Sequence, residues 1–130
     1  MQEIFEFLKK CGTFYIATED GDKPRVRPFG ALNIFEGKLY IQTGKSKNVS
    51  KQMQINSNIE ICGFVDGKWI RVEGQVVRDD RREAKLSMLD ANPMLKNMYS
   101  ADDDNTEVLY IKNGKATIYS FTDEAREIEF

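Results

Sequence analysis

"IEICGFVDGKWIRVEGQVVR" (residues 59–78) contains two runs of alternating apolar and polar residues, separated by an Asp-Gly pair. A period of two is typical of half-buried strands, and Asp-Gly is a strong signal for a two-residue hairpin turn. The pattern predicts strands at 59–65 and 68–78, paired antiparallel, with Ile70 and Val72 on the same face. An antiparallel sheet is therefore the starting point for interpreting the rest of the chain.

Turn and strand signals continue on both sides of this hairpin, and no strand–helix–strand unit repeats. Short helices are predicted at 2–10, after an N-cap at Ser46, and at 79–92. The remaining strands are predicted at 13–18, at 25–35 with an interruption near Pro28 and Gly30, at 38–43, and on both sides of a last Asn-Gly hairpin at 113–114. We expect one domain, 1–130, that is mainly β: an antiparallel six- or seven-stranded split β-barrel with a few short peripheral helices.

The composition excludes several classes of protein. A net charge of −2 over 130 residues is not the profile of a nucleic-acid-binding chain. The chain has no histidine, which removes Ser/His and Cys/His catalytic pairs and most zinc sites, and no metal site is expected. No apolar run reaches the length of a membrane span, and the N-terminus does not resemble a secretory signal. A cytoplasmic location is expected.

The sulfur-containing residues are expected to be structural. The two cysteines lie in different predicted elements without CxxC spacing, which indicates reduced thiols rather than a disulfide. Cys62 lies on an alternating strand and is expected to be an inert core thiol. The methionines expected to fill the core are Met53, Met88 and Met98.

Basic residues are concentrated in one segment, 23–51, which carries seven basic side chains against one acid. Arg25 and Arg27 are two residues apart, so both guanidinium groups would lie on one face of an extended strand. The next strand ends at Thr43, just before a predicted helix start, so that hydroxyl groups, cations and helix N–H groups converge. This combination is typical of a phosphate site, although a solvated basic face would show the same clustering. Lys9 lies outside the segment and is expected to take no part.

Three stretches in this order resemble the pyridoxamine 5′-phosphate oxidase-like FMN-binding split barrels: PRVRPFG (24–30), GKLYIQTGKSKNVSKQMQINSNIEIC (37–62) and GKWIRVEGQVV (67–77). The closest likeness is to the small bacterial general-stress-type branch, and it extends over nearly the whole chain. The resemblance implies a homodimer with FMN at the subunit interface. The residues that it places at the cofactor are Arg25, Arg27, Pro28, Phe29, Gly30, Thr43, Ser46, Lys47, Asn48, Lys51, Gln52 and Trp69.

The resemblance also implies a flavin-dependent oxidoreductase that acts on a small molecule, with no catalytic residue assigned. The C-terminal residues YSFTDEAREIEF (119–130) contain no counterpart of the substrate-phosphate residues of the oxidase itself, so another substrate is expected. Two alternatives stay open: a non-catalytic FMN-binding stress or flavin-buffering protein, and a split barrel that binds deazaflavin or haem. The lack of histidine disfavours haem, which would then need a cysteine, methionine or tyrosine as axial ligand.

Overall fold

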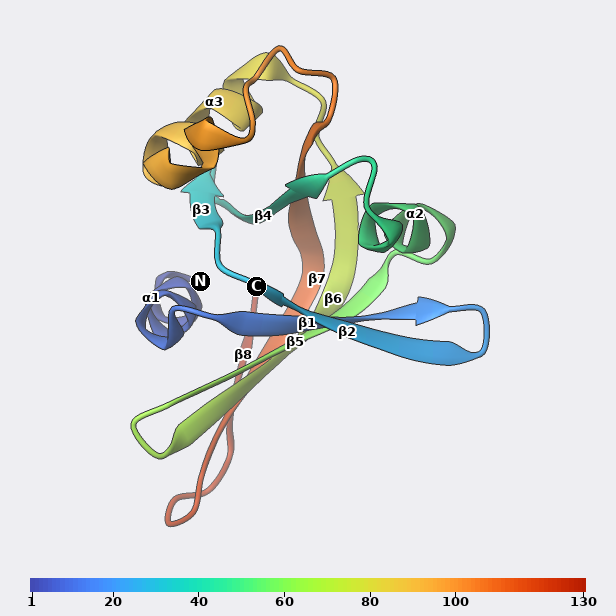
Figure 1. Ribbon diagram of the computed structural model, residues 1–130. Helices are drawn as coiled ribbons and strands as arrows, with labels where there is room; N and C mark the ends of the chain where they lie inside the picture. The colour runs from blue at the N-terminus through green and yellow to red at the C-terminus, as the bar shows by residue number, and fades with distance from the viewer.

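A computed structural model describes all residues, 1–130, and its centre is one antiparallel sheet (Figure 1). The strands are β1 (Phe14–Asp20), β2 (Lys23–Phe29), β3 (Leu32–Phe35), β4 (Lys38–Gly44), β5 (Asn58–Val65), β6 (Lys68–Arg78), β7 (Thr106–Ser120) and β8 (Arg126–Glu129). The helices are α1 (Gln2–Cys11), α2 (Asn48–Ile55), α3 (Arg82–Ala91) and a 3-10 helix, η1 (Pro93–Asn97).

The predicted β5–β6 hairpin is confirmed and lies in the middle of the sheet. The strand order is β2-β1-β5-β6-β7-β4-β3, and β8 pairs with β7 off this path. Asp66 and Gly67 both have positive φ, 53° and 73°, as a type I′ turn requires. Ile61 pairs with Val72, and both side chains are buried. This hairpin therefore supplies part of the core.

The sheet curves around its core without closing, which confirms the split-barrel prediction. β2 and β3 are consecutive in the chain, yet they lie at opposite ends of the strand order. The chain passes between them through Gly30 and Ala31, where the predicted interruption occurs. One apolar cluster of 19 buried residues fills the inside of the sheet, and a smaller one, which includes Tyr40 and Met88, lies beneath α3. The break between β2 and β3 opens the sheet at one place.

The strand count and the last hairpin differ from the sequence-based prediction. Residues 106–120 form one strand, β7, so the hairpin predicted at Asn113 and Gly114 is wrong. A type I′ turn needs two consecutive residues with positive φ, and of this pair only Asn113 has it (53°). The two residues instead form a bulge opposite Gly74, and β8 pairs with the second half of β7. Because 25–35 divides into β2 and β3, and because β8 is an additional strand, eight strands result rather than six or seven.

Two helices begin later than predicted. α2 begins at Asn48 with Lys47 at its N-cap, so the predicted cap at Ser46 is wrong. α3 begins at Arg82 rather than at residue 79. None of the helices combines the length and the apolar character needed to cross a membrane.

Two expected core residues are exposed. Cys62 points away from the core, because Ile61 and Gly63 take the neighbouring inward positions of β5. Met98 is 75% exposed just after η1, whereas the other two methionines expected in the core are buried. The prediction that Cys62 is a core thiol is therefore wrong, since its side chain lies on the outer face of β5.

Candidate functional site

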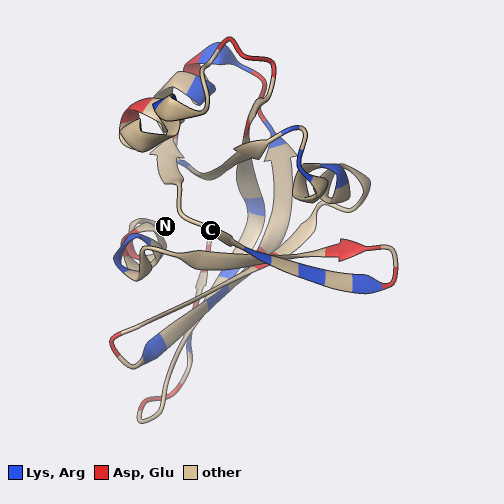
Figure 2. Ribbon diagram, viewed as in Figure 1, with Lys and Arg blue, Asp and Glu red and all other residues tan.

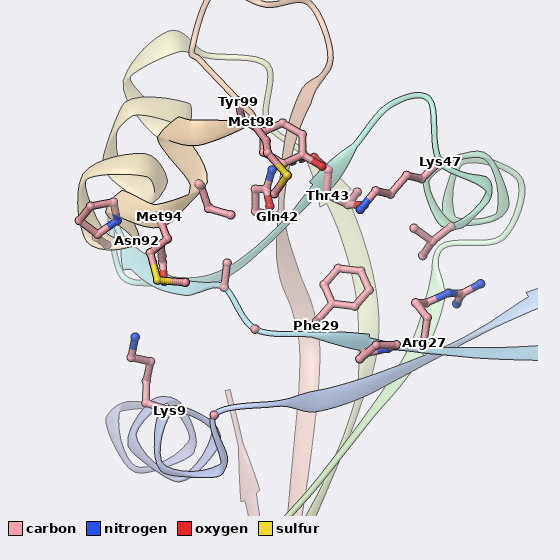
Figure 3. Close-up of a pocket in the computed structure, with 18 residues that line it drawn as sticks. Lys9, Arg27, Phe29, Gln42, Thr43, Lys47, Asn92, Met94, Met98 and Tyr99 are labelled. Carbon is pink, nitrogen blue, oxygen red and sulfur yellow. Dashed lines mark hydrogen bonds between the residues drawn. The ribbon is translucent and has the colours of Figure 1, made fainter.

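A cavity of about 590 Å³ opens beside the break between β2 and β3. Its walls come from the end of β2, from β4, from the end of α1, from the start of α2 and from η1 (Figure 3). The charged side chains that line it are Lys9, Arg27 and Lys47, and no carboxylate does so. None of these three cations forms an ion pair within the chain. A cavity with this charge balance favours an anionic ligand.

Arg27 is held in place by neutral partners. Its Nη1 donates to Thr18 Oγ1 (2.7 Å) and its Nη2 donates to Gln52 Oε1 (2.7 Å). Every other arginine of the chain pairs with a carboxylate. Burial, followed by the positive charge of Arg25, lowers the pKa of Arg27. A half-buried guanidinium without a counter-ion is unfavourable, and a bound anion would supply the missing charge.

The loop that carries Lys47 is fixed by Asn105, which lies just before β7. The backbone oxygen of Asn105 accepts the N–H of Lys45 (2.7 Å), and its Oδ1 accepts the N–H of Ser46 (3.0 Å). The N–H of Lys47 donates to the oxygen of Gly44 (3.0 Å). These three N–H groups are therefore occupied, although the sequence suggested that this loop would offer free ones.

A second hollow, of about 470 Å³, adjoins the cavity and shares Arg27, Lys47 and Val49 with it. The N–H groups of Asn48 and Val49, in the first turn of α2, have no acceptor within the chain. These two N–H groups add to the positive charge of Arg27 and Lys47, because a helix N-terminus attracts negative charge. Figure 2 shows basic residues along β2 and in the segment that leads into α2, as the charge pattern of the sequence predicted.

Another side of the cavity is apolar and is formed by η1 and the residue after it. Met94 and Met98 line it although they are 83% and 75% exposed to solvent, and Leu95 lies between them in the chain. Phe29, at the end of β2, faces the same space (Figure 3). The cavity therefore combines a cationic side with an apolar one.

Two contacts fix η1 in this position. Asn92 Nδ2 donates to the backbone oxygen of Leu32 (3.0 Å) on β3. Tyr99 packs against Gly44, where a Cβ would approach the phenolic oxygen to 3.2 Å. The sequence carries a signal for this wall, because large apolar residues in "PMLKNMY", 93–99, directly after a helix, are unusual in a solvated loop.

The structure brings together most of the residues predicted at the cofactor. Those that line the main cavity are Arg27, Pro28, Phe29, Gly30, Thr43 and Lys47. Those that line only the adjoining hollow are Arg25, Asn48 and Gln52, and Arg25 also forms an ion pair with Asp20 (3.1 Å). Those that line neither are Ser46, Lys51 and Trp69. Trp69 lies on the outer face of the sheet, stacked on Tyr119 with 5.4 Å between ring centroids.

Lys9, which was expected to take no part, lines the main cavity from α1. Figure 3 shows it across the cavity from Arg27 and Lys47. No pattern in the sequence pointed to this position, because α1 is separated from the basic segment by a full strand and a turn. Only the packing of α1 against β5 and β3 reveals it.

Comparisons with known proteins agree with this fold. A family model described as pyridoxamine 5′-phosphate oxidase matches residues 1–125. No protein with a curated description matches the chain. Among solved structures, a NimC/NimA family protein from Clostridium acetobutylicum is 52% identical, with 98% of this chain and 93% of that chain covered and a TM-score of 0.94.

Two further structures have lower identity and show the fold alone. General Stress Protein 26 from Bacillus anthracis is 21% identical, with 98% of this chain and 97% of that chain covered and a TM-score of 0.74. An FMN-binding protein related to pyridoxamine 5′-phosphate oxidase from Nostoc punctiforme is 14% identical, with 99% and 95% covered and a TM-score of 0.66.

Proposed function

Since the chain belongs to the pyridoxamine 5′-phosphate oxidase family, we propose that it binds FMN and acts as a flavin-dependent oxidoreductase on a small molecule. The phosphate would be held by Arg27, Lys47 and the free N–H groups at the start of α2. The flavin would contact Phe29 and Gly30, which line the same cavity at the end of β2.

The observation that carries this proposal is the unpaired, half-buried Arg27 beside a second unpaired cation, Lys47, in a cavity without carboxylates. Hydrogen bonds to charged groups contribute about 1.5–3 kcal/mol each when they are not fully solvated. A phosphate can accept several of them at once, since it offers three peripheral oxygens. A neutral ligand would leave Arg27 without a counter-ion.

The cavity offers few groups for proton transfer, chiefly the Tyr99 hydroxyl and its lysines, and is better suited to binding. No histidine, cysteine or carboxylate lines the cavity. FMN, when bound, would supply the redox chemistry itself. The roles left to the chain are to hold the phosphate through its cations and to keep water from the apolar side through Met94, Leu95 and Met98. A reaction whose electrons move through the cofactor fits this set of side chains.

We also propose that the chain forms a homodimer through the outer face of the sheet. Tyr15, Phe64 and Phe121 are 49%, 61% and 82% exposed, and Trp69 lies beside Phe64 in the β5–β6 pairing. Large exposed aromatic side chains gathered on one face are typical of an interaction site. Tyr15 pairs with Pro28, which also lines the cavity, so a second subunit on this face would border the proposed flavin site.

The proposal is tested by the absorbance spectrum of the purified protein and by the mass of any released cofactor. A flavin spectrum and the mass of FMN are expected. A haem or deazaflavin spectrum, or a colourless protein that does not take up added FMN, would contradict FMN binding. Oxidation of a reduced nicotinamide in the presence of an electron acceptor would then separate an oxidoreductase from a protein that only stores flavin.

A further inference from the structure

We propose that Lys9 forms a second anion-binding position in the main cavity and that it recognises a negatively charged group on a small apolar substrate. This inference rests on the proposed function, because it assigns the opposite side of the cavity to the flavin phosphate. It names the class of substrate: a compact, largely apolar or aromatic molecule that carries one negative charge.

The first support is the contrast between two adjacent lysines. Lys10 forms an exposed ion pair with Asp66, which lies in the turn between β5 and β6. Lys9 lines the cavity and pairs with no carboxylate. The two neighbouring lysines thus differ in whether their charge is free to bind an anion. Of these two lysines, only Lys9 has an unpaired charge that is directed to the cavity (Figure 3).

The second support is that the position of Lys9 is fixed by packing. Leu8, the residue before it, is fully buried and packs against Gly63, where a Cβ would lie 3.4 Å from Leu8 Cδ2. Gly12 caps the helix directly after Cys11, and its backbone oxygen would lie 3.7 Å from a Cβ on Gly30, at the edge of the cavity. The backbone of Lys9 is therefore anchored beside the cavity, although its side chain is long.

The third support is the character of the space near Lys9. The cavity surface contributed by η1 consists of Pro93, Met94 and Leu95, with Met98 just beyond it. Methionine adapts to irregular apolar shapes and makes favourable contacts with aromatic rings. An apolar wall close to a single cation suits a molecule with an apolar body and one anionic group.

The test compares benzoate with benzamide, which have nearly the same shape and differ in charge. Their dissociation constants are measured by calorimetry on the protein as purified, for the natural sequence, for Lys9→Gln and for Lys10→Gln. We expect the natural protein to bind benzoate about fivefold more tightly than benzamide, as expected for one partly solvated ion pair. Lys9→Gln should bring this ratio to about one, and Lys10→Gln should leave it unchanged.

A second variant guards against a general loss of structure. Lys9→Glu should reverse the preference, so that benzamide binds more tightly than benzoate, which a misfolded protein would not do. The inference is overturned if the natural protein shows no benzoate preference or no binding of benzoate, or if Lys9→Gln leaves the ratio unchanged. An equal loss of the benzoate preference in Lys10→Gln would overturn the inference too.

The FMN content of the same samples separates this inference from the proposed function. A protein that takes up no FMN but keeps a Lys9-dependent benzoate preference contradicts the flavin proposal and supports the role of Lys9. A protein that binds FMN and does not distinguish the two probes contradicts only the role of Lys9.

Discussion

Arg27 on β2 donates a hydrogen bond of 2.7 Å from Nη2 to Oε1 of Gln52 on α2. Thr18 completes a triangle: its hydroxyl oxygen accepts from Arg27 Nη1 (2.7 Å), and its hydroxyl donates to Gln52 Oε1 (2.6 Å). The triangle orients the guanidinium without neutralising it. It also ties the strand that carries Arg27 to the helix that follows Lys47, so the two cations are held on one framework.

We predict that Gln52→Met weakens FMN binding about threefold to tenfold and lowers the free energy of unfolding by about 1 kcal/mol. Methionine keeps much of the volume but cannot replace the amide oxygen as acceptor, so Arg27 loses an orienting partner. Fluorescence titration with FMN and urea denaturation measure the two effects. Gln54→Met is the matched control, because Gln54 is exposed on the same helix and does not contact Arg27. Equal effects of the two substitutions would contradict the role given to Gln52.

The sheet could be predicted where side-chain alternation and turn chemistry agree. At 59–78, alternation and an Asp-Gly turn specify the same hairpin, and the structure contains it. At 106–120 the Asn-Gly pair is a local signal that tertiary pairing overrides, because β6 and β8 together hold the chain extended as one strand. Local turn propensity alone cannot report a bulge whose partner, Gly74, lies far away in the sequence.

The cationic side of the site could be predicted because its residues lie close together in the chain. Arg27 and Lys47 belong to one basic segment, and the packing of α2 against β1 and β4 brings them to the same cavity, because β2 and β4 are not paired with each other. Lys9 comes from an element that is distant in sequence and carries no pattern of its own, and the apolar residues around Met94 indicate a buried or ligand-facing wall without indicating where it lies. Their positions depend on how α1 and η1 pack on the sheet, and this packing cannot be inferred from composition or periodicity.

Acid should destabilise the protein partly through Asp79. The Arg81 guanidinium is the main cause that holds the pKa of this buried carboxyl at about 2, and Tyr40 Oη also donates to it (2.8 Å). A carboxyl whose pKa is lowered by folding stabilises the protein above its ordinary pKa, and this stabilisation is lost as the pH falls towards 2.

We therefore expect the free energy of unfolding to fall by about 1 kcal/mol more between about pH 6 and pH 3 in the natural protein than in Asp79→Asn. Urea denaturation at the two pH values measures the difference. Asp80→Asn is the control, since Asp80 is 65% exposed and its nearest cation, Lys45, is 3.6 Å away. If Asp79→Asn and the natural protein show the same pH dependence, Asp79 does not act as described.

Gly74→Ala should destabilise the fold at the β6–β7 bulge. A Cβ at this position would lie 2.7 Å from Ile111 Cγ2 and 3.1 Å from the backbone oxygen of Lys112, so both would have to move. We expect a loss of about 1–3 kcal/mol, as for other overpacked sites. Gly30→Ala, whose Cβ would meet its nearest atom at 3.7 Å, serves as the comparison and should cost much less. Equal unfolding midpoints in urea would argue against this tight packing.

Phe64→Glu should disrupt the proposed homodimer. A charge among the exposed aromatic side chains, beside Trp69, would have to be buried in the interface, which is unfavourable without a partner. Light scattering should give twice 15.0 kDa for the natural protein and 15.0 kDa for this variant. Ile55→Glu is the control, since Ile55 is 90% exposed on α2 rather than on the outer face of the sheet. A natural protein that is monomeric with FMN bound would contradict the dimer.

The most direct test of the central claim is a comparison of FMN with riboflavin, which lacks the phosphate, in titrations of Arg27→Ala, Lys47→Ala and Lys23→Ala. Lys23 is an exposed residue of the same strand as Arg27 that lines neither hollow. We predict that Arg27→Ala weakens FMN about tenfold or more and riboflavin less than about twofold, that Lys47→Ala acts in the same direction, and that Lys23→Ala changes neither. Unchanged FMN affinity in both Arg27→Ala and Lys47→Ala, or an equal loss for FMN and riboflavin, would show that the phosphate is not bound by these cations.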